Sequence, residues 1–74
     1  MSYNGHKNYA YWSVSLWINN DEGLYNMARG YCRRNTRREA ARLMRDDLAE
    51  MGITKTPDGA NYSISAIQAA MVGM

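Results

Sequence analysis

The 74-residue chain contains no phenylalanine and only one proline, one histidine and one cysteine. A lone Cys32 excludes an internal disulfide, and with His6 as the single histidine no zinc site of ordinary composition can be assembled. No run approaches the roughly 18 apolar residues of a membrane span, and the N-terminus lacks the apolar block of a signal peptide. We therefore expect a protein without metal or cofactor, in a reducing, cytoplasmic setting.

The length predicts one domain, residues 1–74, because a chain of this size buries only about 60% of its unfolded surface. Without a disulfide or a metal, stability has to come from dense packing or from a partner chain. The packing material is two tryptophans, six tyrosines and six methionines, residue types that are enriched at interfaces. Residues 1–8 are polar, and we expect them to form a loosely ordered arm.

The segment AYWSVSLWI, residues 10–18, fits two structures. Its even positions are all apolar, with Ser13 and Ser15 alternating between them, as in a strand. Trp12 and Leu16 also share one face of a helix, and the opposite face is apolar as well, as in a helix buried on most sides. We favour the helix, in which Trp12 and Leu16 belong to the core, and the strand stays open.

A second helix is predicted after the polar residues 19–22, which are suited to end one element and to cap the next. Arg33 and Arg34 would close this helix favourably, because cations stabilise a helix C-terminus. Its apolar face contains the residues that recur at spacings of three and four: Leu24, Met27, Ala28 and Tyr31.

Thr36 and Glu39 form a T-x-x-E capping box, the signature of a helix N-terminus. The helix that it opens, residues 36–51, is rich in arginine and stops at Gly52, where a left-handed residue is expected. At about 100° per residue, its side chains form three stripes. The apolar stripe contains Ala40, Ala41, Met44, Leu48 and Met51, the basic stripe Arg38, Arg42 and Arg45, and the acidic stripe Glu39, Asp46, Asp47 and Glu50.

The sequence TPDG at 56–59 predicts a tight turn, since proline fixes one dihedral and glycine supplies a positive one. The last segment has Ile64, Ile67 and Ala70 or Met71 at helical spacing and predicts a closing helix. Together these patterns predict an all-α fold, a compact small bundle of three to four short helices. The alternative is an α+β fold in which residues 10–18 form a strand.

No group of residues predicts catalysis. His6, the serines and Cys32 are too scattered in sequence to argue for a nucleophile and its base, so we expect no enzyme. Cys32 fits a small, partly buried hydrophobic residue better than a reactive thiol. Asp46 and Asp47 lie about 100° apart on a helix and do not face one ligand; they fit a solvated acidic stripe.

All seven arginines lie in residues 29–45, against Glu39 alone, which gives 7 − 1 = +6 there and 2 − 6 = −4 elsewhere. Such an asymmetry bears on partners and not on fold. The candidate partner-binding residues are Arg38, Arg42 and Arg45, joined by Arg34 if the helix extends backwards. Three interpretations stay open: contacts to nucleic-acid phosphates, bidentate contacts to an acidic protein surface, or pairing with the neighbouring acidic stripe in water.

The N-terminal third contains NYAYWSVSLWINNDE at residues 8–22, followed by Tyr25. This stretch resembles the opening of a family of small tailed-phage proteins, which has an N-Y-x-T-W-x-V-x-L-W-[IL]-x-N-D-E pattern followed by a tyrosine. Tyr11 departs from this pattern, because a threonine that could cap a helix is usual there, and the TPDG turn is also similar. The positions that match are Asn8, Tyr9, Trp12, Val14, Leu16, Trp17, Ile18, Asn20, Asp21, Glu22 and Tyr25.

The resemblance implies an origin and no assigned activity. Short phage accessory proteins often bind a protein complex of the host, so we expect stoichiometric binding to such a complex in the bacterial cytoplasm. An inhibitor of a defence system, of the anti-CRISPR or anti-restriction type, would fit this expectation. The alternative is a small nucleic-acid-binding regulator that uses the arginine-rich helix 36–51. Self-association stays open.

Overall fold

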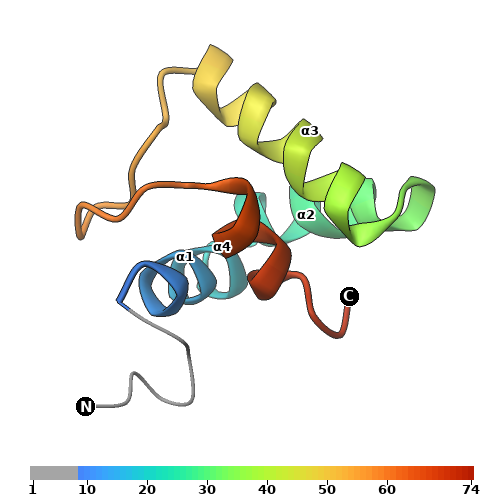
Figure 1. The fold of residues 1–74 in the computed structure, drawn as a ribbon, viewed down its shortest axis with the longest axis horizontal. Helices are drawn as coiled ribbons and strands as arrows, with labels where there is room; N and C mark the ends of the chain where they lie inside the picture. The colour runs from blue at the N-terminus through green and yellow to red at the C-terminus, as the bar shows by residue number, and fades with distance from the viewer. Residues whose placement is uncertain (1–8) are drawn as a thin grey trace.

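A computed structural model describes residues 9–74; the predicted arm, residues 1–8, lies outside the described residues. This range forms four helices, coloured from blue to red in Figure 1: α1 Tyr9–Asn20, α2 Glu22–Arg34, α3 Arg37–Glu50 and α4 Ile64–Ala70. The predicted all-α class is confirmed. Residues 10–18 are helical, so the strand alternative is wrong.

The four helices contact one another in a closed order, because α1 and α3 each pack against both α2 and α4. The short α4 therefore lies between α1 and α3, as Figure 1 shows. A single apolar cluster fills the interior, and every helix contributes to it. Its largest fully buried apolar side chains are Val14, Ile18, Met44, Leu48, Ile67 and Met71.

Polar side chains define the junction between α1 and α2. The Asn20 amide donates to the Leu16 carbonyl at 2.7 Å in the last turn of α1. Asp21 is the N-cap of α2, and its carboxylate accepts from the Leu24 N–H at 3.0 Å. Such a bond satisfies one of the donors that the first helical turn leaves unpaired, which confirms the predicted end and cap.

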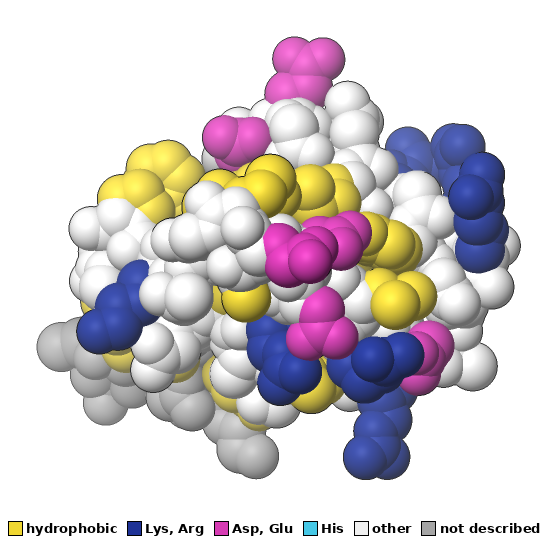
Figure 2. Space-filling model, turned by 90° about the horizontal axis from the view of Figure 1, so that it is seen from above, with side chains coloured by type: hydrophobic (Ala, Val, Ile, Leu, Met, Phe, Trp, Pro, Cys, Tyr) yellow, Lys and Arg dark blue, Asp and Glu magenta, His cyan; other side chains and the backbone are white. Residues whose placement is uncertain are grey.

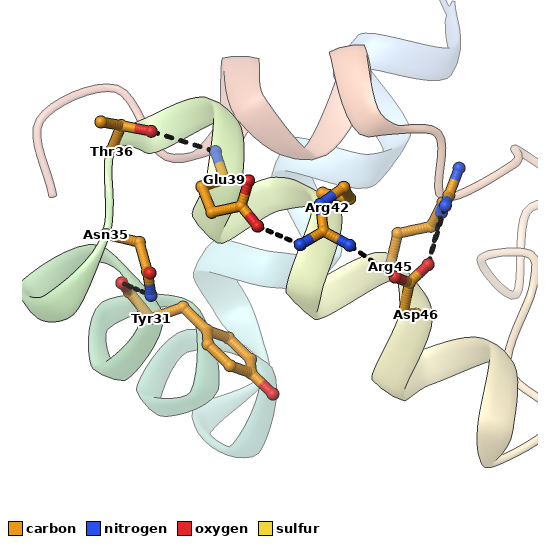
Figure 3. Close-up of polar contacts among 7 residues, drawn as sticks. All are labelled: Tyr31, Asn35, Thr36, Glu39, Arg42, Arg45 and Asp46. Carbon is orange, nitrogen blue, oxygen red and sulfur yellow. Dashed lines mark hydrogen bonds and ion pairs between the residues drawn. The ribbon is translucent and has the colours of Figure 1, made fainter.

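At the N-terminus of α3, Thr36 acts as the predicted cap, since its hydroxyl accepts from the Glu39 N–H at 3.3 Å. The Glu39 carboxylate does not complete the capping box as expected but bonds Arg42 along the helix. The α2–α3 connection is short because Asn35 ends α2, donating to the Tyr31 carbonyl at 3.1 Å from both its backbone and its side chain (Figure 3).

The C-terminus of α3 is closed by a left-handed glycine, as predicted. Gly52 has φ +79° and donates to the Ala49 carbonyl at 3.0 Å, while Ile53 donates to the Leu48 carbonyl at 2.8 Å. This pair of bonds is the Schellman motif, which satisfies the last carbonyls of a helix and turns the chain back.

Residues 54–62 form a narrow loop around the predicted TPDG turn. Gly59 has φ +89°, and its N–H donates to the Thr56 carbonyl at 2.8 Å. Thr56 N–H donates to the Ala60 carbonyl at 2.7 Å, and Tyr62 N–H donates to the Thr54 carbonyl at 3.0 Å. These backbone hydrogen bonds hold the loop in one defined conformation before α4 begins.

This loop is fastened to α1 by side chains from three successive turns. Tyr9 donates to the Asp58 carbonyl at 2.7 Å, and the Trp17 indole donates to the Asp58 carboxylate at 2.9 Å. Between them, the Ser13 hydroxyl lies 2.8 Å from the buried hydroxyl of Thr56 and 3.3 Å from the Asp58 carboxylate. The spacing of four residues puts all three donors on one face of α1.

The inward face of α1 is not the predicted one. Val14, Ile18 and Ser13 are fully buried, whereas Leu16 is 38% exposed and Trp12 is only half-buried. The expectation that Trp12 and Leu16 form the core is therefore wrong for Leu16 and holds in part for Trp12. The physical reason is the polar attachment to the loop, which turns the Ser13 side of the helix inward.

The apolar stripe of α3 is confirmed for all but its last member. Met44 and Leu48 are fully buried, as are Ala40 and Ala41. Met51, in contrast, is 55% exposed, because it is the C-cap residue at the end of α3, directly before the turn at Gly52.

Ile18→Ala should destabilise the protein by about 2 to 5 kcal/mol, since removing a buried branched side chain leaves a cavity. The matched change Leu16→Ala, on the same helix, should lose less than half as much, because this side chain is already partly in water. Urea unfolding measures both. Equal losses would contradict the inward face of α1.

Asp58→Ala should destabilise the protein by about 1.5 to 3 kcal/mol, the range for hydrogen bonds to a charged group, and should shift the NMR signal of the Trp17 indole N–H. Asp58→Asn keeps a side-chain oxygen that can accept from Trp17, so it should retain more than half of this stability. An unshifted indole signal in Asp58→Ala would show that the contact is not made in solution.

Candidate functional site

The three predicted basic residues of α3 lie on its exposed side, away from the buried stripe. Arg38, Arg42 and Arg45 are all exposed. They do not make an unbroken basic surface. Figure 2, which looks down on α3, shows Lys and Arg side chains interleaved with Asp and Glu side chains.

Arg42 is held between two carboxylates of its own helix. Its guanidinium bonds Glu39 one turn back and lies 3.3 Å from the Asp46 carboxylate one turn on (Figure 3). Both partners are those that the sequence spacing predicted. The hydrogen bond from Arg42 lowers the pKa of Glu39, and the same bond raises the pKa of Arg42.

Arg45 shares one of these carboxylates, since its guanidinium lies 2.7 Å from Asp46. Arg38 forms no ion pair with any of residues 9–74. Three arginines against Glu39 and Asp46 leave a net charge of 3 − 2 = +1 on this surface. This set of side chains is therefore weakly basic, and Arg38 is the only one of its three arginines without an ion pair among the described residues.

Arg38 and Arg42 line a hollow of about 560 Å³ between α3 and α4. The far side of the hollow comes from α4 and carries hydroxyl, amide and apolar groups: Ser65, Gln68 and Ile64. The sequence did not indicate these residues, because only the docking of α4 beside α3 brings them there. Glu39 also lines the hollow, which thus offers the Arg38 cation and the paired Arg42 and Glu39 beside neutral hydrogen-bonding groups and an apolar edge.

Arg34 does not join this surface. It is the last residue of α2, and α3 begins only at Arg37 after the break at Asn35 and Thr36, so the backward extension on which its inclusion rested does not occur. Arg34 instead lines a separate hollow between α2 and α3.

Cys32 is half-buried, as expected of a small hydrophobic residue. Burial raises the pKa of its thiol, and the nearby charge of Arg37 only partly opposes this effect. The thiol form therefore dominates near neutral pH, which disfavours reactivity. Residues 9–74 contain no group of three side chains placed to hold a metal ion, and His6 lies outside the described residues.

The described residues define a small all-α domain with a mixed-charge surface over α3 and α4. A family model matches residues 1–74, and the chain belongs to this family, a family of unknown function named DUF7249. No curated protein and no solved structure matches the chain. None of the helices in residues 9–74 has the length and apolar character needed to cross a bilayer.

Arg42→Gln should raise the pKa of Glu39 toward its ordinary value of 4.5, because the lowered pKa comes first from the Arg42 hydrogen bond. A carboxyl with a lowered folded pKa adds stability above its unfolded pKa, and this stability is lost as pH falls through the folded pKa. NMR titration of the Glu39 side chain in both proteins measures the effect. Identical titration midpoints would show that the pair does not persist in water.

Proposed function

We propose that this protein acts by stoichiometric binding to a host protein complex, using the α3–α4 surface around Arg38 and Arg42. The observation that carries the proposal is the hollow that these two residues share with α4. Arg38 provides a planar donor for a carboxylate, and bidentate contacts of this kind are strong and specific. The complementary partner surface carries an acidic side chain for Arg38 and a basic or hydrogen-bonding group near Glu39, which also lines the hollow.

The charge arrangement favours a protein over nucleic acid as the partner. A nucleic-acid groove needs several cations that neutralise successive phosphates. Here Arg42 and Arg45 are already paired with Glu39 and Asp46, and these carboxylates would repel a phosphate backbone. A protein surface that carries both signs of charge avoids this conflict.

The resemblance of the N-terminal motif to tailed-phage proteins supports a bacterial host as the source of the partner. In that setting the protein acts in the host cytoplasm. A defence complex of the restriction or CRISPR type is the target class that we propose, and occupation of a functional surface is the mode of inhibition.

The proposal is tested by capture from a nuclease-treated bacterial lysate and by titration with a generic DNA duplex. The site variant is R38Q/R42Q, and the matched control is R29Q/K55Q, which removes the same charge from exposed residues outside the hollow. We expect the wild type and the control to retain a discrete protein complex and the site variant to lose it. Duplex binding should be negligible for all three proteins.

Two results would contradict this proposal. Duplex binding by the wild type that falls with a log–log salt slope of about −0.9 per phosphate contact, and that R38Q/R42Q abolishes, would favour the nucleic-acid regulator. Capture that R38Q/R42Q leaves unchanged would show that these arginines are only solvated.

A further inference from the structure

The opposite flank of α3 faces α2 and forms a second groove, in which apolar side chains lie beside asparagine and charged side chains. Two hollows lie in line along this seam, and Met27 lines both of them. Tyr31 and Leu43 line the first hollow and Met51 the second. Met51 is 55% exposed, and Figure 2 shows hydrophobic side chains lying open across this face of the molecule.

Gly30 lies in this groove, within α2. A glycine inside a helix costs roughly 0.5 to 1 kcal/mol relative to alanine. The folded chain does not need one there, because a Cβ at Gly30 would meet nothing within 4 Å, and its φ is not positive. A bare backbone on an exposed helix face allows another chain to approach closely.

The groove carries opposite charges at its two ends. Arg33 and Arg34 line the end near the α2–α3 connection, and Asp47 and Glu50 line the other. Met27, which lines the acidic hollow, precedes Arg33 and Arg34 by six to seven residues on α2, so at 1.5 Å per helical residue the two ends lie roughly 10 Å apart. Two positive charges therefore face two negative charges across an apolar centre, and this pattern is complementary to its own copy turned by 180°.

We propose that the α2–α3 groove is a self-association surface, on which a second copy of this chain docks about a two-fold axis. The axis passes near Gly30, and the basic end of each copy lies on the acidic end of the other. A two-fold interface uses the same patch on both partners, which is what the balanced ends provide. The proposal is independent of the function proposed for the α3–α4 hollow.

The small size of the groove predicts a modest affinity. Interfaces that bury less than about 1,200 Å² belong to weak complexes, so we expect a dissociation constant on the order of micromolar. Sedimentation velocity over roughly 10 µM to 1 mM should show a monomer–dimer equilibrium for the wild type. A protein that remains monomeric over this whole range would overturn the proposal.

Charge reversal tests the pairing directly. R33E/R34E makes both ends acidic and D47K/E50K makes both ends basic, so each variant alone should associate at least tenfold more weakly than the wild type. An equimolar mixture should regain a one-to-one complex, because both contacts become complementary again. The control R37E/R38E changes charge as R33E/R34E does, but outside the groove, and should leave self-association unchanged.

Gly30→Ala is a second test, because it separates the effect of this residue on the stability of the monomer from its effect on self-association. The substitution should raise the urea midpoint of the dilute monomer, because alanine favours the helix, and should weaken self-association about tenfold through the added methyl group. A raised midpoint with unchanged association would overturn the close approach at Gly30. If the wild type is monomeric and the groove variants lose a bacterial protein that the wild type captures, the self-association proposal is overturned in favour of a different partner chain.

Discussion

The attachment of the TPDG loop to α1 is the contact on which the rest of the bundle depends. Asp58 accepts from Trp17 through its carboxylate and from Tyr9 through its carbonyl, and Ser13 meets the buried hydroxyl of Thr56 beside it. The loop precedes α4, which has seven residues, too few to be stable alone in water. Because the loop is held at α1, α4 enters between α1 and α3, and its apolar face completes the core.

The elements that could be predicted from the sequence are those set by local rules. The periodicity of α2 and α3, the caps at Asp21 and Thr36, and the left-handed Gly52 each depend on neighbours within one turn, so short-range patterns sufficed. The prediction of the inward face of α1 was wrong because the helix has two apolar faces, and periodicity cannot choose between them. The choice comes from Ser13, whose hydroxyl finds its partner 43 residues away.

The candidate site likewise has one part that could be predicted from the sequence and one part that could not. The pairing of Arg42 with Glu39 and Asp46 follows from spacings of three and four on one helix, and the structure has both contacts. The α3–α4 hollow could not be predicted, since Ser65 and Gln68 reach Arg38 only through the tertiary position of α4. Arg34 would share the basic stripe only if α3 extended backwards through Asn35. The chain breaks at Asn35 instead, and this break depends on how α2 ends.

The two flanks of α3 differ in chemistry, and this difference bears on how the protein can work. The flank toward α4 offers a hollow with one unneutralised cation among the described residues, whereas the flank toward α2 offers a groove of two hollows with opposite charges at its two ends. A second copy in the α2–α3 groove would leave both Arg38 hollows open. Such a dimer would present two identical sites, and a target with repeated surfaces would be bound more tightly than either site alone permits, provided that both sites can reach it at once.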